Sequence, residues 1–280
     1  MLLFCHYQMS TVVKQTSTML LSALRHFRGK NMESKILLAF DFDHTIIDAN
    51  SDLRVKVLAP YGEIPQEIED QYSDSGWTEY MGEIFKYLHS IGIRENDMKK
   101  CMHEIEITEG MADLIRHAAE MGHELIIISD SNSVFIDFIL DNSNLKHAVL
   151  KVFTNPAKFD KNGQLKIEYY HTQDWCNRST VNLCKGHILQ EFIKERAKSG
   201  VTFSHVLYIG DGSNDLCPAL TLREQDFVYP RINFRLWKKL IGQKASSEQL
   251  RAELKAQIIS WDSGFDVLKH LKELENKMNC

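Results

Sequence analysis

The sequence predicts an α/β fold built on a doubly wound parallel sheet. Three short apolar runs, at 36–40, 125–128 and 206–209, each end in small, polar or acidic residues. Runs this short and this apolar are typical of strands that are buried on both faces of a parallel sheet. Helical patterns lie between them, as expected for the crossovers of a doubly wound sheet.

The segment after the first strand is predicted to be helical. From Asp41 to about Ile107 there is no further strand-like run. Six side chains instead recur at helical spacing: Trp77, Tyr80, Met81, Ile84, Phe85 and Leu88. We interpret this stripe as the core of a small helical domain, in preference to a cofactor-binding box. The domain organisation is then a core of 34–53 and 108–280 with a helical cap at 54–107.

The remaining elements alternate along the chain. Their boundaries follow from apolar periodicity, capping residues and turn residues. In order, we expect a helix at 108–122 with a Thr cap and a terminating glycine, a strand at 124–128, a helix at 134–141, a hairpin at Asn162-Gly163 between 151–153 and 165–170, a helix at 181–198 and a strand at 203–209.

The composition is that of an ordinary globular protein. The 280 residues are 44% hydrophobic and 25% charged, with a net charge of −5, which gives no indication of nucleic-acid binding. Six cysteines without regular spacing indicate reduced thiols and not a disulfide framework. No apolar run approaches the roughly 18 residues of a membrane span. We therefore expect no nucleic-acid or membrane partner, and a cytoplasmic location.

The first 33 residues differ from the rest of the chain. Residues 1–32 contain no Asp or Glu, are rich in Ser and Thr, and carry Lys14, Arg25, Arg28 and Lys30. This composition is compatible with a mitochondrial transit peptide. The interpretation that we favour is a disordered extension, or an upstream start for a protein whose functional start is Met32. Segment 1–33 is therefore left out of the predicted fold.

Asp41 and Asp43 follow the first strand directly. Alternate residues of an extended chain point to the same side, so both carboxylates would share one side of the sheet's carboxyl edge, where open α/β folds bind ligands. Two like charges that close require a cation or a shared proton. Mg²⁺ meets this need because it prefers a few carboxylates together with substrate phosphate oxygens.

A lone Asp-x-Asp could equally be a solvated turn. However, the run at 206–209 ends in the acidic sequence GDGSND (210–215), and the run at 125–128 ends in Ser129-Asp130. Three strands that end in such residues predict one composite site along one edge of the sheet.

This combination resembles the haloacid dehalogenase-like (HAD) phosphatase superfamily. The likeness is carried, in order, by DFDHT (41–45), Ser129, Lys185 and GDGSND. It is closer to the branch of phosphoethanolamine/phosphocholine and pyridoxal-phosphate phosphatases, and nearest to the pyridoxal-phosphate phosphatases. That closer likeness extends from about Lys35 to the C-terminus through FDFDHTIIDANSD, EYMGEIFKYL, IIISDSNSVFIDF, VFTNP, NLCK, YIGDGSNDLCP and YPR.

The resemblance implies a Rossmann-like core with a small helical cap inserted after the first strand. It also implies Mg²⁺-dependent hydrolysis of small phosphomonoesters through an aspartyl-phosphate, with pyridoxal 5'-phosphate, phosphoethanolamine or phosphocholine as substrates. Asp41 would be the nucleophile, and Asp43 would protonate the leaving oxygen and later activate water. The carboxylates of Asp41 and Asp211 and the backbone carbonyl of Asp43 would hold the metal.

Phosphate binding is assigned on the same resemblance. Ser129 and the first amides of the following helix would hold phosphate oxygens. Lys185 would supply positive charge opposite the metal, and Asp215 would orient the metal shell. The alternative for Lys185 is a solvated lysine on a helix that begins near Val181.

One loop departs from the branch pattern. The relatives usually show His-x-His-x-Cys-x-x-Cys-Pro before the Cys-Lys pair, whereas one His, one Cys and the Pro are missing after His171 in this chain. A zinc site at His171, Cys176 and Cys184 is the minor alternative to a loop without a metal.

Asp52 and Asp130 match positions that the branch uses to contact substrate. Carboxylates beside a phosphate site favour substrates that also carry positive charge, such as an ammonium group or the ring nitrogen of pyridoxal phosphate. The alternative is that both residues cap helices.

Two other functions remain open. One is a phosphatase for another small phosphate such as phosphoserine, which would require an Arg from the cap, either Arg54 or Arg94. The other is a catalytically silent phosphate-binding module, although such a module would have no need of Asp43.

Overall fold

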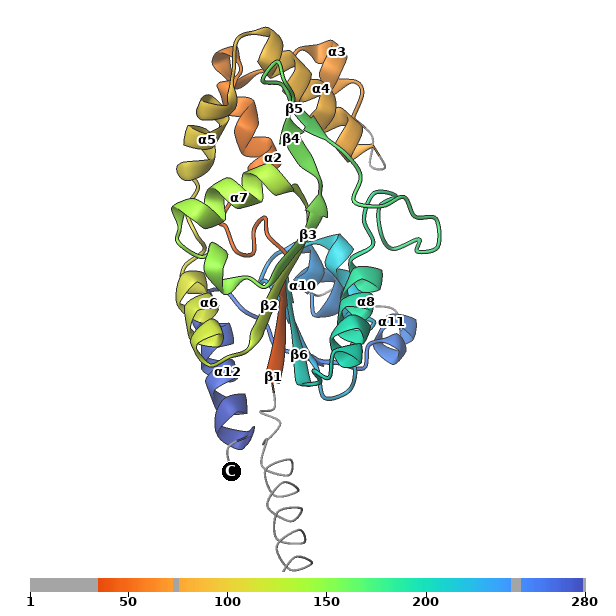
Figure 1. Ribbon diagram of the computed structural model, residues 1–280. Coiled ribbons are helices and arrows are strands. Elements are labelled where there is room, and N and C mark those ends of the chain that lie inside the picture. Colours follow the sequence, from red (N-terminus) through yellow and green to blue (C-terminus); the bar gives the residue numbers. More distant parts are fainter. Residues whose placement is uncertain (1–34, 73–75, 243–247, 279–280) are drawn as a thin grey trace, which may run out of the picture. The chain divides into compact units, whose positions relative to one another are not determined.

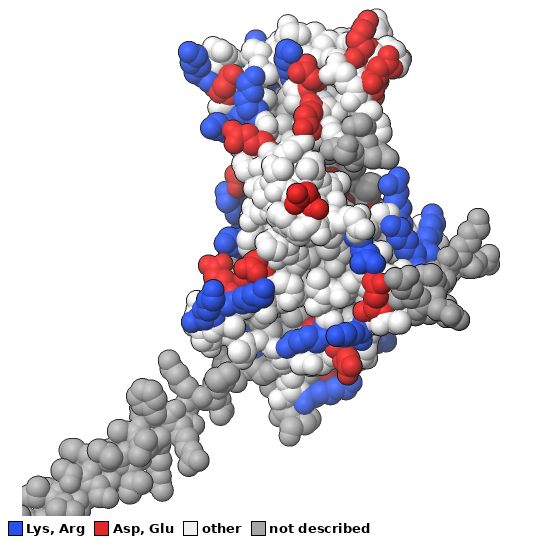
Figure 2. Space-filling model, turned by 90° about the vertical axis from the view of Figure 1, so that its right-hand side faces the viewer, with Lys and Arg blue, Asp and Glu red and all other residues white. Residues whose placement is uncertain are grey.

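The computed structural model describes residues 35–72, 76–242 and 248–278 (Figure 1). The predicted extension at 1–33 lies outside these residues. Acidic and basic side chains are interspersed over much of the face seen in Figure 2. Among the described residues, no helix combines the length and the apolar character that crossing a bilayer would require.

A six-stranded parallel sheet lies at the centre of the described chain, in the order β3-β2-β1-β6-β7-β8. On one side of β1 the sheet continues through β2 and β3, and on the other through β6 to β8. The order therefore reverses between β1 and β6, which is where open α/β sheets bind ligands. The predicted fold class is confirmed. The strands are β1 (Lys35–Phe40), β2 (Glu124–Asn132), β3 (Lys151–Asn155), β6 (Phe203–Gly210), β7 (Phe227–Pro230) and β8 (Gln257–Ile258).

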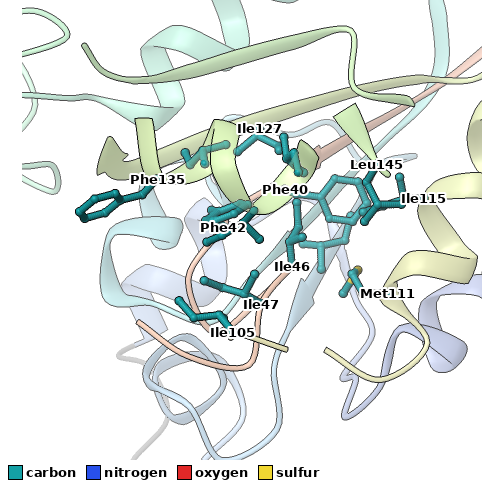
Figure 3. Close-up of a cluster of buried hydrophobic side chains, with 14 of the residues drawn as sticks. Phe40, Phe42, Ile46, Ile47, Ile105, Met111, Ile115, Ile127, Phe135 and Leu145 are labelled. Carbon is teal, nitrogen blue, oxygen red and sulfur yellow. The ribbon is translucent and has the colours of Figure 1, made fainter. Parts of the chain in front are cut away.

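Helices cover both faces of the sheet, because successive apolar residues of a strand point to opposite faces and both faces must be buried. Leu38 and Phe40 pack into one buried cluster, and Leu37 and Ala39 into another. Figure 3 shows part of the first cluster, which includes Phe40 of β1, Ile127 of β2, and Met111 and Ile115 from a helix that covers this face. The first face carries α6 (Met111–Glu120), α7 (Ser133–Asn142) and α12 (Gly264–Met278), and the second carries α8 (Lys185–Lys198), α9 (Leu216–Ala219) and α10 (Arg235–Leu240).

The described residues between β1 and β2 form helices, turns and isolated bridges, but no strand. Five of the six side chains in the predicted apolar stripe are buried, and the sixth, Trp77, is partly buried. The helices are α2 (Ser51–Arg54), α3 (Gln66–Glu69), α4 (Trp77–Ser90) and α5 (Glu95–His103), with the 3₁₀ turns η1 (Val55–Leu58) and η2 (Pro60–Gly62).

A short antiparallel hairpin, β4 (Ala157–Phe159) and β5 (Leu165–Ile167), lies against α4 (Figure 1). The predicted turn at Asn162-Gly163 is present, and Gly163 has a positive φ of 80°. However, the incoming strand is β4 and not 151–153, because residues 151–155 pair with β2 as the edge strand of the main sheet.

Two predicted helix starts are wrong. Helix α6 begins at Met111 behind Gly110, and the Thr108 hydroxyl has no hydrogen-bond partner within the described residues. A Cβ at Gly110 would lie 2.6 Å from the backbone nitrogen of Phe265, so this close approach selects glycine at the cap. Helix α8 begins at Lys185 and not near Val181.

Residues 181–184 form a loop that is held by tertiary hydrogen bonds. The backbone N–H of Cys184 donates to Nε2 of His171 (2.9 Å), and the side-chain amide of Asn182 donates to Asn155 (3.0 Å). The remaining short elements are η3 (Lys146–Ala148), η4 (Ser213–Asp215) and α11 (Glu248–Glu253).

Candidate active site

The carboxyl edge of the sheet brings the predicted residues together. Phe40 pairs with Ile127 of β2 and with Ile209 of β6, so the residues that follow these strands emerge at one edge. They line an open pocket of about 1110 Å³. Six of the predicted site residues line this pocket: Asp41, Asp43, Asp52, Ser129, Asp130 and Asp211. The seventh, Lys185, lies buried behind Asp41.

Lys185 connects two buried carboxylates. Its side chain is 1% exposed, and its Nζ lies 2.8 Å from Oδ1 of Asp41 and 2.8 Å from Oδ1 of Asp215. Burial opposes its charge, but attraction to Asp215, Asp41 and Asp130 is stronger and holds the pKa of Lys185 well above its usual range. The alternative of a solvated lysine is therefore wrong.

Asp215 is saturated with donors. Its Oδ1 accepts from Lys185 and from the hydroxyl of Tyr208 (2.7 Å), and its Oδ2 accepts from the backbone N–H groups of Asp211 (3.0 Å) and Gly212 (2.8 Å). Four such bonds use the acceptor capacity of a carboxylate. Asp215 thus fixes the loop that carries Asp211, in keeping with an orienting role and not a ligand role.

Asp41, Asp211 and Asp215 form a compact acidic cluster. Each offers a carboxylate oxygen, and these oxygens all lie within 4.8 Å of one another. Lys185 alone cannot neutralise three carboxylates, and a divalent cation would complete the balance. Because Asp215 is occupied, Asp41 and Asp211 remain available to offer oxygen atoms of the hard type that Mg²⁺ prefers.

The crowding of acids shifts their protonation. Burial, with the nearby charge of Asp52, raises the pKa of Asp43 to about 8. Burial, with the charge of Asp215, raises the pKa of Asp211 to about 7 and also raises that of Asp41. Without a bound cation, Asp43 would thus be largely protonated at neutral pH, the state of a proton donor. Its Oδ1 accepts from the backbone N–H of Ser51 (3.1 Å).

Asp52 is held by tertiary contacts and caps no helix. It is 2% exposed and accepts from Nε1 of Trp77 (2.8 Å) and from the side-chain amide of Asn132 (3.4 Å). The cap of α2 is Asn50, whose side chain accepts from the backbone N–H of Leu53. The capping interpretation is wrong for Asp52.

It is also wrong for Asp130. The cap of α7 is Asn132, whose side chain accepts from the backbone N–H groups of Val134 and Phe135. The first amides of this helix were predicted to hold phosphate, but the N–H groups of Val134 and Phe135 already donate to Asn132. The hydroxyl of Ser129 accepts from the backbone N–H of Ser131 (3.2 Å).

Asp130 lines the pocket, and one of its carboxylate oxygens has no partner among the described residues. Its Oδ2 accepts from the side-chain amide of Asn214 (2.5 Å). Its backbone carbonyl accepts from the side-chain amide of Asn155 (2.7 Å). Its Oδ1 is buried without a hydrogen-bond partner in the described part of the chain. Leaving a buried carboxylate oxygen without a partner is costly, so a donor that reached it would stabilise it.

Sequence reasoning missed three contributors. Trp77, which was assigned to the core, lines the pocket beside Tyr72 and donates to Asp52. Asn214 orients Asp130. Arg231 donates to the carbonyl of His44 (2.7 Å) and pairs with Asp48, so it braces the turn after the first strand. Asn214 and Arg231 lie in the GDGSND and YPR motifs, which could have indicated them.

The predicted alternative of a zinc site with His171 is not what the structure shows. The Nε2 of His171 is occupied by the backbone N–H of Cys184. A different third residue, Cys217, lies with Cys176 and Cys184.

Comparison with known proteins identifies relatives along most of the chain. A family model described as "Putative Phosphatase" matches residues 36–275. The pyridoxal phosphate phosphatase PHOSPHO2 of Bos taurus is 43% identical over 242 residues, which cover 86% of this chain and 98% of that protein. The phosphoethanolamine/phosphocholine phosphatase of Homo sapiens is 33% identical over 242 residues, covering 86% of this chain and 89% of that protein.

Solved structures share the fold. A substrate-bound phosphoserine phosphatase has a TM-score of 0.52 at 16% identity, covering 85% of this chain and 99% of its own. The phosphoserine phosphatase from T. onnurineus has a TM-score of 0.51 at 17% identity, with 87% and 97% covered.

A sheet of this order with these relatives defines a HAD-like phosphatase, an enzyme that hydrolyses phosphoric monoesters. More particularly, the chain belongs to the Putative Phosphatase family, whose model spans nearly the whole of the described sequence.

Proposed function

We propose that this chain is a Mg²⁺-dependent phosphatase that cleaves small phosphomonoesters through an aspartyl-phosphate. Pyridoxal 5'-phosphate and phosphoethanolamine or phosphocholine are the proposed substrates. The observation that carries the proposal is the buried Asp41–Lys185–Asp215 array with Asp211 beside it. The relatives named for these substrates support the same chemistry.

Asp41 is the proposed nucleophile. Its Oδ1 accepts from Lys185 (2.8 Å) and from the backbone N–H of Phe42 (2.7 Å). Both donors bind one oxygen, which leaves Oδ2 for attack on phosphorus. Asp41 and Asp211, with the backbone carbonyl of Asp43, would hold Mg²⁺, which when bound lets the anionic carboxylate approach the phosphate and stabilises transition-state charge.

Asp43 is the proposed acid and base. It is placed two residues after the nucleophile and is held by the backbone of Ser51. In its protonated form it gives a proton to the leaving oxygen, and as a carboxylate it then takes one from the attacking water. Activation of water by Asp43 distinguishes a phosphatase from a silent phosphate-binding module, which would not need an acid and base at this position.

The phosphoryl oxygens would be held from two sides. Ser129 lies at the pocket wall at the end of β2. Lys185 is positioned by Asp41 and Asp215, so its charge is fixed in advance of substrate binding. Groups fixed in this way need no reorganisation during the reaction, which is how preorganised charge lowers a barrier.

Asp52 and Asp130 would select the substrate. Both line the pocket, and Trp77 places an aromatic ring beside Asp52. An ammonium group or a protonated ring nitrogen suits a carboxylate next to an aromatic face.

The phosphoserine alternative lacks its expected partner. Arg54 pairs with Glu104 (2.7 Å), and Arg94 donates to the backbone carbonyl of His89 (2.8 Å). Neither lines the pocket.

The test is a phosphate-release screen of about a hundred monoesters with Mg²⁺, using Asp41→Asn as the blank. We expect release from pyridoxal 5'-phosphate or the two amino-alcohol phosphates, and loss of release with a chelator. Activity confined to phosphoserine would reject the substrate assignment. No release from any monoester would favour the silent module.

A further inference from the structure

Three thiols converge next to the proposed active site, in a place that the proposed mechanism does not use. The Sγ of Cys217 lies 3.5 Å from that of Cys176 and 3.8 Å from that of Cys184. All three sulfur atoms lie within 4.8 Å of one another. Cys184 and Cys217 are buried, and Cys176 is partly buried.

The spacing of the sulfur atoms fits a tetrahedral metal. With Zn–S bonds of about 2.3 Å, the edges of a tetrahedron of sulfur ligands are about 3.8 Å long. The two measured separations are close to this value. A disulfide, by contrast, would draw two sulfur atoms to about 2.05 Å and leave the third unpaired.

The chain is arranged to hold the sulfurs in place. Cys176 and Cys184 come from the loop between β5 and α8, where Cys184 caps α8, and Cys217 comes from the start of α9. Gly186 makes room for the third, since a Cβ there would lie 2.7 Å from Sγ of Cys217.

A buried glutamine organises the loop that carries Cys176. The side-chain amide of Gln173 donates to the carbonyls of Cys176 (3.1 Å), Ser179 (3.2 Å) and Thr180 (2.8 Å), and its oxygen accepts from the backbone N–H of Cys176 (2.9 Å). A side chain that is 4% exposed and fully bonded in this way sets the loop's shape. The third thiol is therefore presented by a defined turn.

We propose that Cys176, Cys184 and Cys217 bind one Zn²⁺, with water in the fourth position. Each thiol that binds gives up its proton, so binding one ion releases up to three protons. Thiolates select Zn²⁺ over Mg²⁺, which prefers oxygen ligands. The site is therefore separate in chemistry from the carboxylate cluster.

The ion would stabilise the wall of the pocket. Cys184 precedes Lys185 directly, and Cys217 follows Asp215 by two residues. The loop that carries Cys176 also supplies pocket residues 177–182. One ion thus joins the substrate-facing loop to the two elements that carry the Lys185–Asp215 pair.

The experiment measures metal retention by the reduced, full-length protein. After incubation with Zn²⁺ and removal of free metal, we expect one Zn²⁺ per chain, and with Co²⁺ we expect the near-ultraviolet thiolate-to-metal charge-transfer band. Cys176→Ser and Cys217→Ser should lose the retained zinc and the band. Cys176 is partly exposed on a loop, so its variant is the one expected to keep the fold, which circular dichroism checks.

Two variants separate this site from other sources of binding. Cys101→Ser removes a buried thiol elsewhere in the chain and should retain the full zinc content. Asp211→Asn disables the carboxylate cluster and should keep both the zinc and the band. Because neither readout uses phosphatase activity, failure here is distinguishable from failure of the proposed function.

The proposal is overturned if the reduced wild-type protein retains no zinc. It is also overturned if retention is lost in Asp211→Asn and kept in Cys176→Ser. A disulfide of Cys217, found by mass spectrometry together with no zinc binding after reduction, would replace the metal site with a redox pair.

Discussion

The two ends of the pocket are built in different ways. At one end, Asp41 and Asp211 extend directly from neighbouring strands, and Lys185 and Asp215 lock them in place. At the other end, Asp52 is held by Trp77, which belongs to a helix inserted between β1 and β2. At the first end, Asp41 and Asp211 are positioned directly by the strands that precede them, whereas the second end depends on how two separate segments pack.

This difference bears on catalysis and selectivity. Asp41, Lys185 and Asp215 at the strand end are bonded to one another, so changes there should affect every substrate and the stability of the protein. In the proposed function, Asp52 at the helical end and Asp130 at the end of β2 would face the part of a substrate that varies. Changes at these two carboxylates should discriminate between substrates and leave the fold largely intact.

The largest expected effect comes from removing the proposed nucleophile. Asp41→Asn keeps the shape of the side chain but cannot form an acyl-phosphate, so kcat should fall by about 10⁴-fold or more on every substrate. Steady-state kinetics on two unrelated monoesters measures the loss. A residual rate within tenfold of wild type, or a loss confined to one substrate, would contradict the assignment.

The next effect concerns stability. Lys185→Met leaves Asp41 and Asp215 buried beside each other without their cation, and breaking a buried pair in this way costs about 3–5 kcal/mol. Denaturant unfolding in the presence of a chelator measures the change.

The matched control is Lys194→Met, which removes an exposed pair with Glu191 and should cost less than about 0.5 kcal/mol. Equal effects of the two variants would show that the buried Asp41–Lys185–Asp215 array stabilises the fold no more than an exposed ion pair does.

The proposed substrate-selecting carboxylates should show selectivity. Asp130→Ala removes a carboxylate that would attract a positive substrate group, so kcat/KM for phosphoethanolamine should fall about tenfold more than that for a phosphate ester with a neutral leaving group. Asp174→Ala, an exposed change on the nearby loop, should alter neither. Equal losses on both substrates would reject a role of Asp130 in selectivity.

The same comparison explains which features could be predicted from sequence. The parallel sheet and the convergence of Asp41, Ser129 and Asp211 follow from apolar runs that end in polar motifs, because parallel strands place their carboxyl ends at one edge. Local signals sufficed there, since each side chain is positioned by its own strand.

Features that depend on distant contacts were not predictable in this way. For Asp52 and Asp130 the sequence left helix capping open as an alternative to substrate contact, but Asn50 and Asn132 take the cap positions. Trp77 fitted an apolar stripe, yet its indole N–H bonds to Asp52. Likewise, Cys217 could not be grouped with Cys176 from spacing alone, because the fold brings those segments together.

The smallest expected effect is a dependence of stability on pH in the absence of metal. The pKa values of Asp43 (about 8) and Asp211 (about 7) lie above their usual range because the groups are buried among other acids. The folded chain therefore keeps protons that the unfolded chain releases. The resulting contribution to the free energy of unfolding is present at low pH and is lost as the pH rises through the folded-state pKa values of about 7 and 8. With a chelator, the Tm should fall between pH 6 and pH 8.5, and added Mg²⁺ should reduce the fall because it binds the ionised carboxylates.

Asp43→Asn has one such group fewer, so its Tm should fall less than that of the wild type over the same range. A wild-type Tm that falls no more than that of Asp43→Asn would mean that Asp43 is already ionised in the folded protein at pH 6, and that another group supplies the proton to the leaving oxygen.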